Sequence, residues 1–214
     1  MKPIDRQHIY QHGRFAYKNF ILLSEDEKKL VWAWRNDPRI RAWMTNGDEI
    51  PWENHLRFIE SLKNRTDKVY WLVLKDEQPI GVFDIIDIDD EKAETEPGYY
   101  LHPDLLDSGE GLPFNFNFRS FLYDVLGFEC VKGNIKMGNE RALTISTFFG
   151  VFPVGVEMLT DGEHLIMRGK KEDFPQLTEK QLLKAFVSFA RSHKIDWEAL
   201  RTQLTTDSCK RPIS

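Results

Sequence analysis

Cysteine is scarce in this sequence, which has only Cys130 and Cys209 among its 214 residues. Two cysteines make no disulfide framework, and no pair in the chain has the spacing of a metal site. Such sparse use of cysteine is typical of proteins in a reducing compartment. We therefore expect no disulfide, no bound metal and a cytoplasmic location.

Long apolar runs and an excess of positive charge are also missing. No apolar stretch reaches the roughly 20 residues of a membrane-spanning helix, and residues 1–10 are polar, unlike a signal peptide. The 29 basic and 34 acidic residues give a formal net charge of −5, whereas nucleic-acid binding draws on an excess of Lys and Arg. We therefore expect neither a membrane nor a nucleic-acid partner, while a local site for a small anion stays open.

Aromatic residues are plentiful, with 15 Phe and 6 Trp in a chain that is 41% apolar. This is ample for a packed core and excludes a largely disordered protein. The length suits one domain with an appendage. Because the composition changes after Gly169 to a charged link at residues 170–173, we expect a domain over residues 1–169 and a helical C-terminal extension over residues 170–214.

Hydrophobic periodicity and turn residues predict a mixed α/β arrangement. Ser24 and Glu27 form a capping box, and Thr178 with Gln181 forms a second. A turn is expected at Gln78–Pro79 and a hairpin turn at Asp161–Gly162. Strands are predicted over residues 20–23, 69–74, 80–88, 98–101, 131–135, 151–159 and 164–167. Helices are predicted after Ser24, Pro51, Pro113, Asn139, Thr178 and Asp196.

A glycine-bearing turn joins the strand at residues 98–101 to the helix after Pro113. The start of a helix offers unpaired N–H groups and a partial positive charge, and glycine lets the backbone approach a ligand closely. Gly109 and Gly111 therefore favour a phosphate site. The alternative is an ordinary helix entry, and Asp107 and Glu110 must point outward if an anion binds here.

The chain reads Glu-Pro-Gly-Tyr at residues 96–99, Gly-Glu-Gly at residues 109–111 and Asn-Glu-Arg-Ala at residues 139–142. These three pieces together resemble the GNAT superfamily of N-acetyltransferases. Residues 96–103 read Glu-Pro-Gly-Tyr-Tyr-Leu-His-Pro and are similar to the strand that holds the pantetheine arm in that family. Gly109-x-Gly111 lies at the place of the family's pyrophosphate loop. Residues 139–142 read Asn-Glu-Arg-Ala and, with Phe149-Gly150, resemble the family's Asn-x-x-Ala helix. The resemblance covers roughly residues 69–167.

This resemblance implies the GNAT fold, a mostly antiparallel mixed sheet flanked by helices, and acetyl-CoA as the acyl donor. It also implies which residues bind that donor. They are Tyr100, Leu101, His102, Ser108, Gly109, Glu110, Gly111, Leu112 and Asn139. Asn139 is expected to cap its helix whatever else it does.

In the N-terminal part, residues 34–38 read Trp-Arg-Asn-Asp-Pro, and Trp43-Met44 and residues 55–64 follow. These pieces are similar to the N-acetyltransferases of pseudaminic acid biosynthesis, which act on an amino group of a UDP-linked sugar. The resemblance implies that Arg35, Asn36, Trp43 and Met44 contact the acceptor. Alternatively, Arg35 and Asn36 bind nearby carbonyls at a helix end, and Trp43 and Met44 pack in the core. His55 is expected to be structural.

The mechanism implied is direct attack of the amine on the thioester, without an acyl-enzyme. Glu96 matches the family's glutamate and is the first candidate for the base; Asp84 on the neighbouring strand is the second. A backbone N–H from residues 100–102 is expected to polarise the carbonyl. Ser146 stands where the family usually has a Tyr that protonates the leaving thiolate. Each acid could instead be solvated, and Ser146 could be helix filler.

At two positions the sequence departs from the family pattern, and these departures leave more than one function open. Leu106 replaces the usual Arg or Gln of the pyrophosphate loop, and Ser146 replaces the Tyr. The sequence favours an acetyl-CoA-dependent N-acetyltransferase acting on a primary amine of an amino-sugar nucleotide or similar small molecule. The alternatives are a non-catalytic acyl-CoA-binding protein and a protein N-terminal acetyltransferase. A homodimer is left open.

Overall fold

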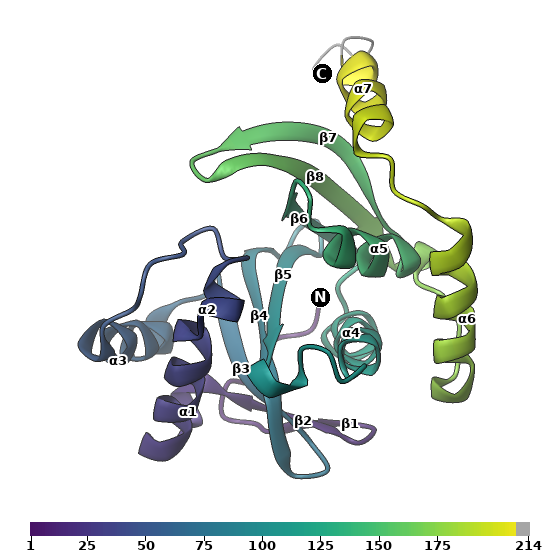
Figure 1. Cartoon of the computed structure of the whole chain (residues 1–214). Helices are drawn as coiled ribbons and strands as arrows, with labels where there is room; N and C mark the ends of the chain where they lie inside the picture. The colour runs from purple at the N-terminus through teal and green to yellow at the C-terminus, as the bar shows by residue number, and fades with distance from the viewer. Residues whose placement is uncertain (209–214) are drawn as a thin grey trace. The chain divides into compact units, whose positions relative to one another are not determined.

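The computed structural model describes residues 1–208, which form two compact units divided between Glu129 and Cys130. The first unit carries most of its helices between the second and third strands (Figure 1). Its elements are β1 (Tyr10–His12), β2 (Phe15–Asn19), α1 (Glu25–Asn36), α2 (Pro38–Arg41), α3 (Trp52–Ser61), β3 (Val69–Lys75), β4 (Gln78–Asp89), β5 (Glu94–Leu101) and α4 (Gly111–Ser120).

The strands of the first unit pair in chain order, from β1 to β5, and every pair is antiparallel. Because side chains alternate across a strand, the register sends Leu72 and Val82 to one face, and Trp71 and Phe83 to the other. Helices α1 and α3 cover the first face and α4 covers the second (Figure 1). The sheet is thus buried on both sides, as its apolar strands require.

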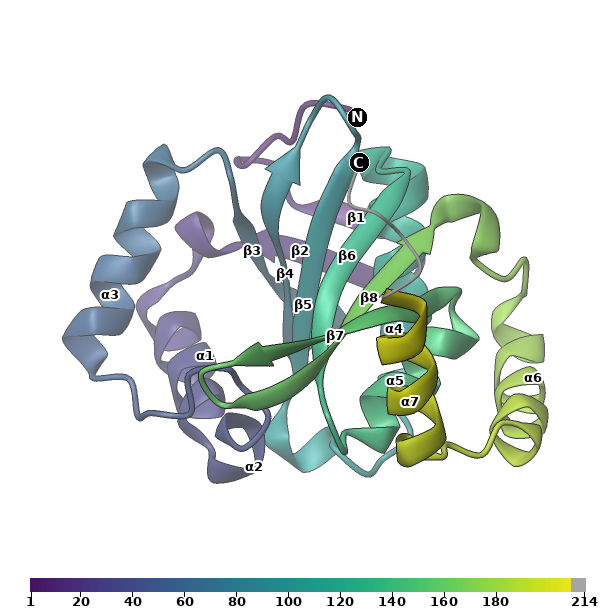
Figure 2. The ribbon, with the colours of Figure 1, turned by 90° about the horizontal axis from the view of Figure 1, so that it is seen from above.

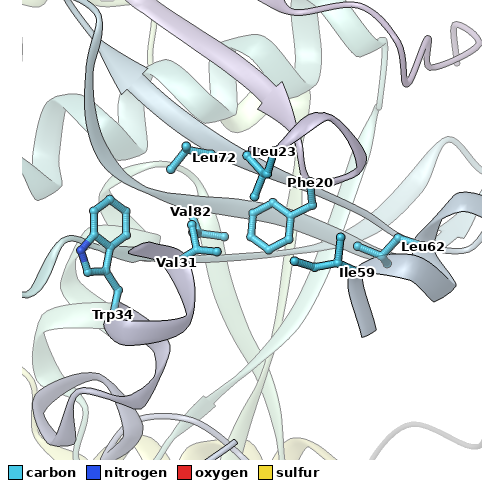
Figure 3. Packing of buried hydrophobic residues seen from close by; sticks show 8 residues of the cluster. All are labelled: Phe20, Leu23, Val31, Trp34, Ile59, Leu62, Leu72 and Val82. Atoms are coloured by element: carbon cyan, nitrogen blue, oxygen red, sulfur yellow. The ribbon is translucent and has the colours of Figure 1, made fainter. Parts of the chain in front are cut away.

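The core between the sheet and helices α1 and α3 is a continuous cluster of aliphatic and aromatic side chains (Figure 3). It includes Phe20, Leu23, Val31, Trp34, Ile59, Leu62, Leu72 and Val82. Helix α1 starts where the sequence predicts, because the Ser24 hydroxyl accepts the Glu27 N–H and the Glu27 carboxylate accepts the Ser24 N–H. His55 is buried with its Nε2 3.1 Å from the Lys28 carbonyl oxygen, so its predicted structural role is confirmed.

The opposite face of the sheet is packed almost entirely with rings. Phe83 stacks on Trp71 at 5.4 Å and on Phe118 of α4 at 4.8 Å between ring centroids. Phe114 of α4 and Phe121, which directly follows α4, are also buried. Each such ring contributes several kcal/mol, about 3–5 for truncation to Ala.

The second unit contains β6 (Cys130–Lys136), α5 (Glu140–Phe148), β7 (Val151–Leu159), β8 (Gly162–Lys170), α6 (Glu179–Ser192) and α7 (Trp197–Ser208). Strand β8 pairs with both β6 and β7, each antiparallel. Helix α7 packs against β7 (Figure 2). The predicted capping box at Thr178 and Gln181 is present at the start of α6. Cys209 lies outside the described residues.

Three predicted boundaries are wrong. Residues 20–23 are not a strand: β2 precedes them, and the Asn19 side chain accepts the Ile21 N–H at 3.1 Å and starts a 3-10 helix instead. The β3–β4 turn is at Asp76 and Glu77, both with positive φ, so Pro79 lies inside β4. Strand β5 starts at Glu94 rather than Gly98.

Among the described residues, no helix combines the length and the apolar character that crossing a membrane would need. Within the same part of the chain, no group of three or more His, Cys, Asp or Glu side chains could hold a metal ion.

Candidate functional site

Asp84 is a carboxylate in the middle of the apolar strand β4, directly opposite Gly98 of β5. A Cβ atom placed on Gly98 would lie 2.8 and 2.9 Å from the two Asp84 carboxylate oxygens, so the glycine leaves the space that this side chain occupies. Burial, and then the negative charge of Glu96, raise the pKa of Asp84 to about 7, while Lys68 opposes the shift. Asp84 therefore exchanges a proton near neutral pH.

Glu96 lies two residues before Gly98 and therefore on the same face of β5. Tyr70 is the β3 partner of Asp84, and Tyr100 lies two residues after Gly98, so both phenols share this face. Burial, followed by the charge of Asp84, raises the pKa of each phenol well above its usual value. Both tyrosines are thus neutral hydrogen-bonding groups beside a titrating carboxyl group.

The loop between α2 and α3 is fastened to the C-terminal end of α1. The Asn36 side chain exchanges two hydrogen bonds with the Ile50 backbone, at 2.8 and 2.9 Å. Nη2 of Arg35 donates to the Asn46 carbonyl oxygen at 2.7 Å. These bonds are the structural alternative that the sequence left open for both residues. Trp43, in contrast, is 55% exposed, so core packing is not its role.

The end of β5 directs its backbone N–H groups in alternating directions. The His102 N–H donates to the Ile80 carbonyl oxygen at 2.8 Å. By the alternation of an antiparallel ladder, the Tyr100 N–H also faces β4, whereas the Leu101 N–H points away from it. Of the three amides predicted to polarise a carbonyl, those of Tyr100 and His102 are therefore directed at β4, and Leu101 is the candidate that remains.

The turn before α4 has the features expected of an anion site. Gly109 has φ of +86°, a conformation that favours glycine. Within residues 1–208, the backbone N–H groups of Gly109 and Gly111 have no acceptor. The Glu110 carboxylate is drawn to Lys75, 2.5 Å away, so its charge is neutralised. Ser108 uses its hydroxyl to accept the Glu110 N–H at 3.2 Å.

Two predicted residues lie in the second unit and are described separately. The Asn139 Oδ1 accepts the Ala142 N–H at 3.1 Å, so the predicted helix cap is confirmed. Ser146 is half-buried in the last turns of α5. This position does not test the proton-donor role predicted for Ser146, which stays a prediction.

The comparisons with known proteins bear on this arrangement. A family model described as an acetyltransferase (GNAT) domain matches residues 21–150, more than half of the chain. The chain belongs to the GNAT acetyltransferase family. That match spans both units, from the 3-10 helix before α1 to the residues just after α5. The boundary predicted at residue 169 is not tested by it and stays a prediction.

Individual GNAT relatives point in the same direction. Two acetyltransferases named PseH from Campylobacter jejuni subsp. jejuni, of serotypes O:2 and O:23/36, are 36% and 34% identical over 128 residues, which cover 60% of this chain and 78% of each relative. The crystal structure of Campylobacter jejuni N-acetyltransferase PseH in complex with acetyl coenzyme A is 25% identical, with a TM-score of 0.57, and covers 73% of this chain and 99% of that one.

A second solved structure shares the fold at low sequence identity. Spermidine N-acetyltransferase from Vibrio cholerae, in complex with CoA and spermine, is 11% identical, with a TM-score of 0.66, and covers 75% of this chain and 97% of that one. The predicted fold class, the acetyltransferase activity and the resemblance to the pseudaminic acid enzymes are thus confirmed. The acetyl-CoA-bound PseH structure agrees with the predicted acyl donor.

Sequence reasoning missed one residue beside the Asp84 carboxyl group, Tyr70. Tyr70 is the β3 residue that pairs with Asp84, which follows from the strand register. That register was obscured by the misplaced turn at Gln78–Pro79. Helix α2 was also missed, because Pro38 was taken only as a helix stop.

Proposed function

We propose that this GNAT enzyme transfers an acetyl group from acetyl-CoA to a primary amine of an amino-sugar nucleotide or a similar small molecule. The observation that carries the proposal is the carboxylate pair of Asp84 and Glu96 on a face otherwise lined by apolar and phenolic side chains. Such a pair attracts a substrate ammonium group and can take its proton. The similarity to the PseH acetyltransferases agrees with the amino-sugar acceptor that the resemblance to the pseudaminic acid enzymes implies.

The donor is assigned to the turn before α4. The N–H groups of Gly109 and Gly111 suit the pyrophosphate of acetyl-CoA, and the Lys75–Glu110 ion pair neutralises the carboxylate that would otherwise repel it. Ser108 and Leu112 flank these glycines. Tyr100, Leu101 and His102 are proposed to border the pantetheine arm, and Asn139 contributes its side-chain amide. Bound there, acetyl-CoA supplies an activated thioester carbonyl.

The protein's own part in the reaction is mainly proton transfer and positioning. An amine is protonated near neutral pH and cannot attack a carbonyl until it loses that proton. Asp84 has the raised pKa, so we assign proton acceptance to Asp84 and a supporting electrostatic role to Glu96. The Leu101 N–H is proposed to donate to the developing oxyanion. Ser146 is proposed to donate a hydrogen bond to the departing sulfur.

The test is thiol release measured against pH with amino-sugar nucleotides, free amino sugars and peptides. Asp84→Asn should lower kcat by about 10²–10⁴-fold with nucleotide-linked amino sugars. In the wild type, kcat/KM should rise with pH through an inflection near pH 7, because Asp84 must be ionised to accept a proton. Glu96→Gln should move the inflection to lower pH, because it removes a charge that raises the pKa of Asp84.

The shift of the inflection in Glu96→Gln shows whether the inflection belongs to Asp84 or to the substrate amine, since the pKa of the free amine does not depend on Glu96. An inflection that stays in place in Glu96→Gln, or full activity in Asp84→Asn, would contradict the assignment. Acetyl-CoA binding without thiol release from any amine would favour the non-catalytic alternative. Thiol release with peptides but not with sugars would favour a protein N-terminal acetyltransferase.

A further inference from the structure

Helix α6 carries an apolar pair on its outer face, in addition to the face that packs against α5 (Figure 1). On the inner face, the rings of Phe186 and Phe189 lie 5.2 and 5.4 Å from that of Phe148 of α5, between centroids. On the outer face, Leu183 is 66% exposed, and Val187, one turn later, is also exposed. A helix that only packs on its own domain needs a single apolar face, so the outer pair indicates a partner.

Positive charge follows the same outer stripe of α6. Lys180, Lys184 and Arg191 are four and seven residues apart, which places them on one side of the helix, and all three are exposed. Glu179, the one acid of α6, lies at the edge of this stripe, about 100° from Lys180 around the helix axis. None of the three cations has an ion-pair partner among residues 1–208. A shallow hollow on this face is lined by Leu183, Lys184, Val187, Ser188, Arg191 and Ser192.

The chemistry of this stripe selects an acidic protein as its partner. Like charges four residues apart weaken a helix, and two copies meeting at this face would bring like charges together. A membrane-bound helix turns its broad apolar face to the lipid, whereas that face of α6 packs on Phe148. Single-stranded nucleic acid is bound by cations and stacking aromatic rings, but the pair at the centre of this stripe is aliphatic. An acidic amphipathic helix of another protein fits both the cations and the aliphatic pair.

Helix α5 relates this face to the proposed donor site. The side chain of Asn139, assigned above to the pantetheine arm, caps the start of α5, and the last residue of α5, Phe148, contacts α6. The nine residues of α5 span about 13 Å. Pantetheine carries acyl groups both in CoA and in acyl carrier proteins, which are acidic helical proteins with the arm attached to a serine. A carrier protein therefore offers the required acidic helix together with the donor group of the proposed reaction.

We propose that the outer face of α6 binds an acidic helix of an acyl carrier protein, so that the acyl group arrives on a protein-borne pantetheine arm as well as on CoA. This inference rests on the proposed function, and the transfer is the same. The substrate ammonium group gives one proton to Asp84. As the carbon–nitrogen bond forms and the carbon–sulfur bond breaks, a second proton passes from the nitrogen to the sulfur, so the carrier leaves as a thiol.

The experiment measures binding of a bacterial acyl carrier protein in its apo form, which lacks the arm, to the full-length protein by fluorescence anisotropy at low and high salt. Lys184→Glu and Arg191→Glu should each weaken binding by about fivefold or more, the upper range for an exposed charge pair, and should reduce its salt dependence. Leu183→Ala should weaken binding without changing the salt dependence. Lys170→Glu is the matched control and should bind like the wild type, because it makes the same charge change at an exposed position outside α6. Melting curves of each variant establish that it is folded.

Three results would overturn the inference. The first is an affinity for the apo carrier that is equal in the wild type, Lys184→Glu and Arg191→Glu, or no binding by any of them. The second is an equal loss in Lys170→Glu, which would reflect net charge alone. The third is a different occupant of the face, seen as binding of phosphatidylserine vesicles instead of the carrier, or as a dimer that Lys184→Glu dissociates in sedimentation.

The apo carrier undergoes no reaction, so its binding is decided separately from the proposed function. Thiol release from acetyl-CoA without carrier binding would overturn this inference alone. Carrier binding that Lys184→Glu and Arg191→Glu weaken would support it, even if no amine tested releases thiol and the proposed function fails. With the acetylated carrier as donor, Lys184→Glu should raise KM for the carrier by about fivefold, and Lys170→Glu should leave that KM unchanged.

Discussion

At the scale of single residues, Asp84 affects both the proposed chemistry and the stability of the protein, because ionising it on β4 destabilises the folded state. The folded protein holds a proton on Asp84 up to about pH 7, whereas the unfolded chain releases it near pH 4. Between these values the folded state binds more protons than the unfolded state. The free energy of unfolding therefore falls as pH rises, by up to about 1.4 kcal/mol per pH unit from this group.

Asp84→Asn should remove this fall in the free energy of unfolding with rising pH, because an amide side chain does not ionise. The variant should melt at a higher temperature than the wild type at pH 8, and the two melting temperatures should converge toward pH 4. Asp90→Asn, at an exposed turn position, is the matched control and should follow the wild type at every pH. A wild type whose melting temperature exceeds that of Asp84→Asn at pH 8 would show that the Asp84 carboxylate is not destabilising.

The same residue illustrates what a sequence can and cannot reveal. The sequence alone shows an acid at position 84 between the apolar residues Phe83 and Ile85. Strand register determines which residues lie beside Asp84: Gly98, which leaves it space, and the phenols of Tyr70 and Tyr100. A slip of one residue in the pairing would move every side chain of the strand to the other face.

At the scale of elements, local signals predicted the helices better than the strands. The capping boxes at Ser24 and Thr178 and the Asn139 cap are short-range hydrogen-bond patterns, and all are present. The β3–β4 turn was misplaced because Asp76 and Glu77 adopt positive φ without a glycine or asparagine to indicate it. The segment at residues 20–23 is apolar because it fills the core beside α1 and α3, which periodicity cannot distinguish from a strand.

The ion pair between Lys75 and Glu110 neutralises a carboxylate at the start of α4, beside the proposed pyrophosphate site. Lys75 extends from the end of β3 over the Phe15 ring and holds the Glu110 carboxylate. Lys75→Met keeps the packing but leaves that carboxylate unpaired beside Gly109 and Gly111. KM for acetyl-CoA should rise roughly fivefold, the upper range for a partly exposed charge pair.

The double variant Lys75→Met with Glu110→Gln should return KM for acetyl-CoA to the wild-type range, because no unpaired charge remains. Glu110→Gln alone serves as the matched control and should not raise KM. An increase in KM of the same size in both the single Lys75 variant and the double variant would mean that Lys75 contacts the donor itself, and not that it restrains Glu110.

At the scale of the whole molecule, the residues proposed for the acceptor and for the pyrophosphate belong to the first unit, whereas Asn139 and Ser146 belong to the second. The GNAT family match ends at residue 150, so the last part of the second unit lies beyond it. That part is tied to α5 by aromatic contacts. Phe186 and Phe189 lie 5.2 and 5.4 Å from Phe148, and Phe174 stacks on Phe149 at 5.8 Å, between ring centroids.

These contacts decide whether residues 170–214 are an appendage, as the composition predicts, or part of the second unit's core. Ending the chain after Gly169 would expose Phe148 and Phe149 and remove buried Leu182. The free energy of unfolding should then fall by about 3 kcal/mol or more, the cost of losing large buried side chains. Ending it after Lys194 keeps α6 and should cost less. Denaturant unfolding of the three proteins measures this, and equal stability of the Gly169 truncation and the full chain would establish the extension as a separable appendage.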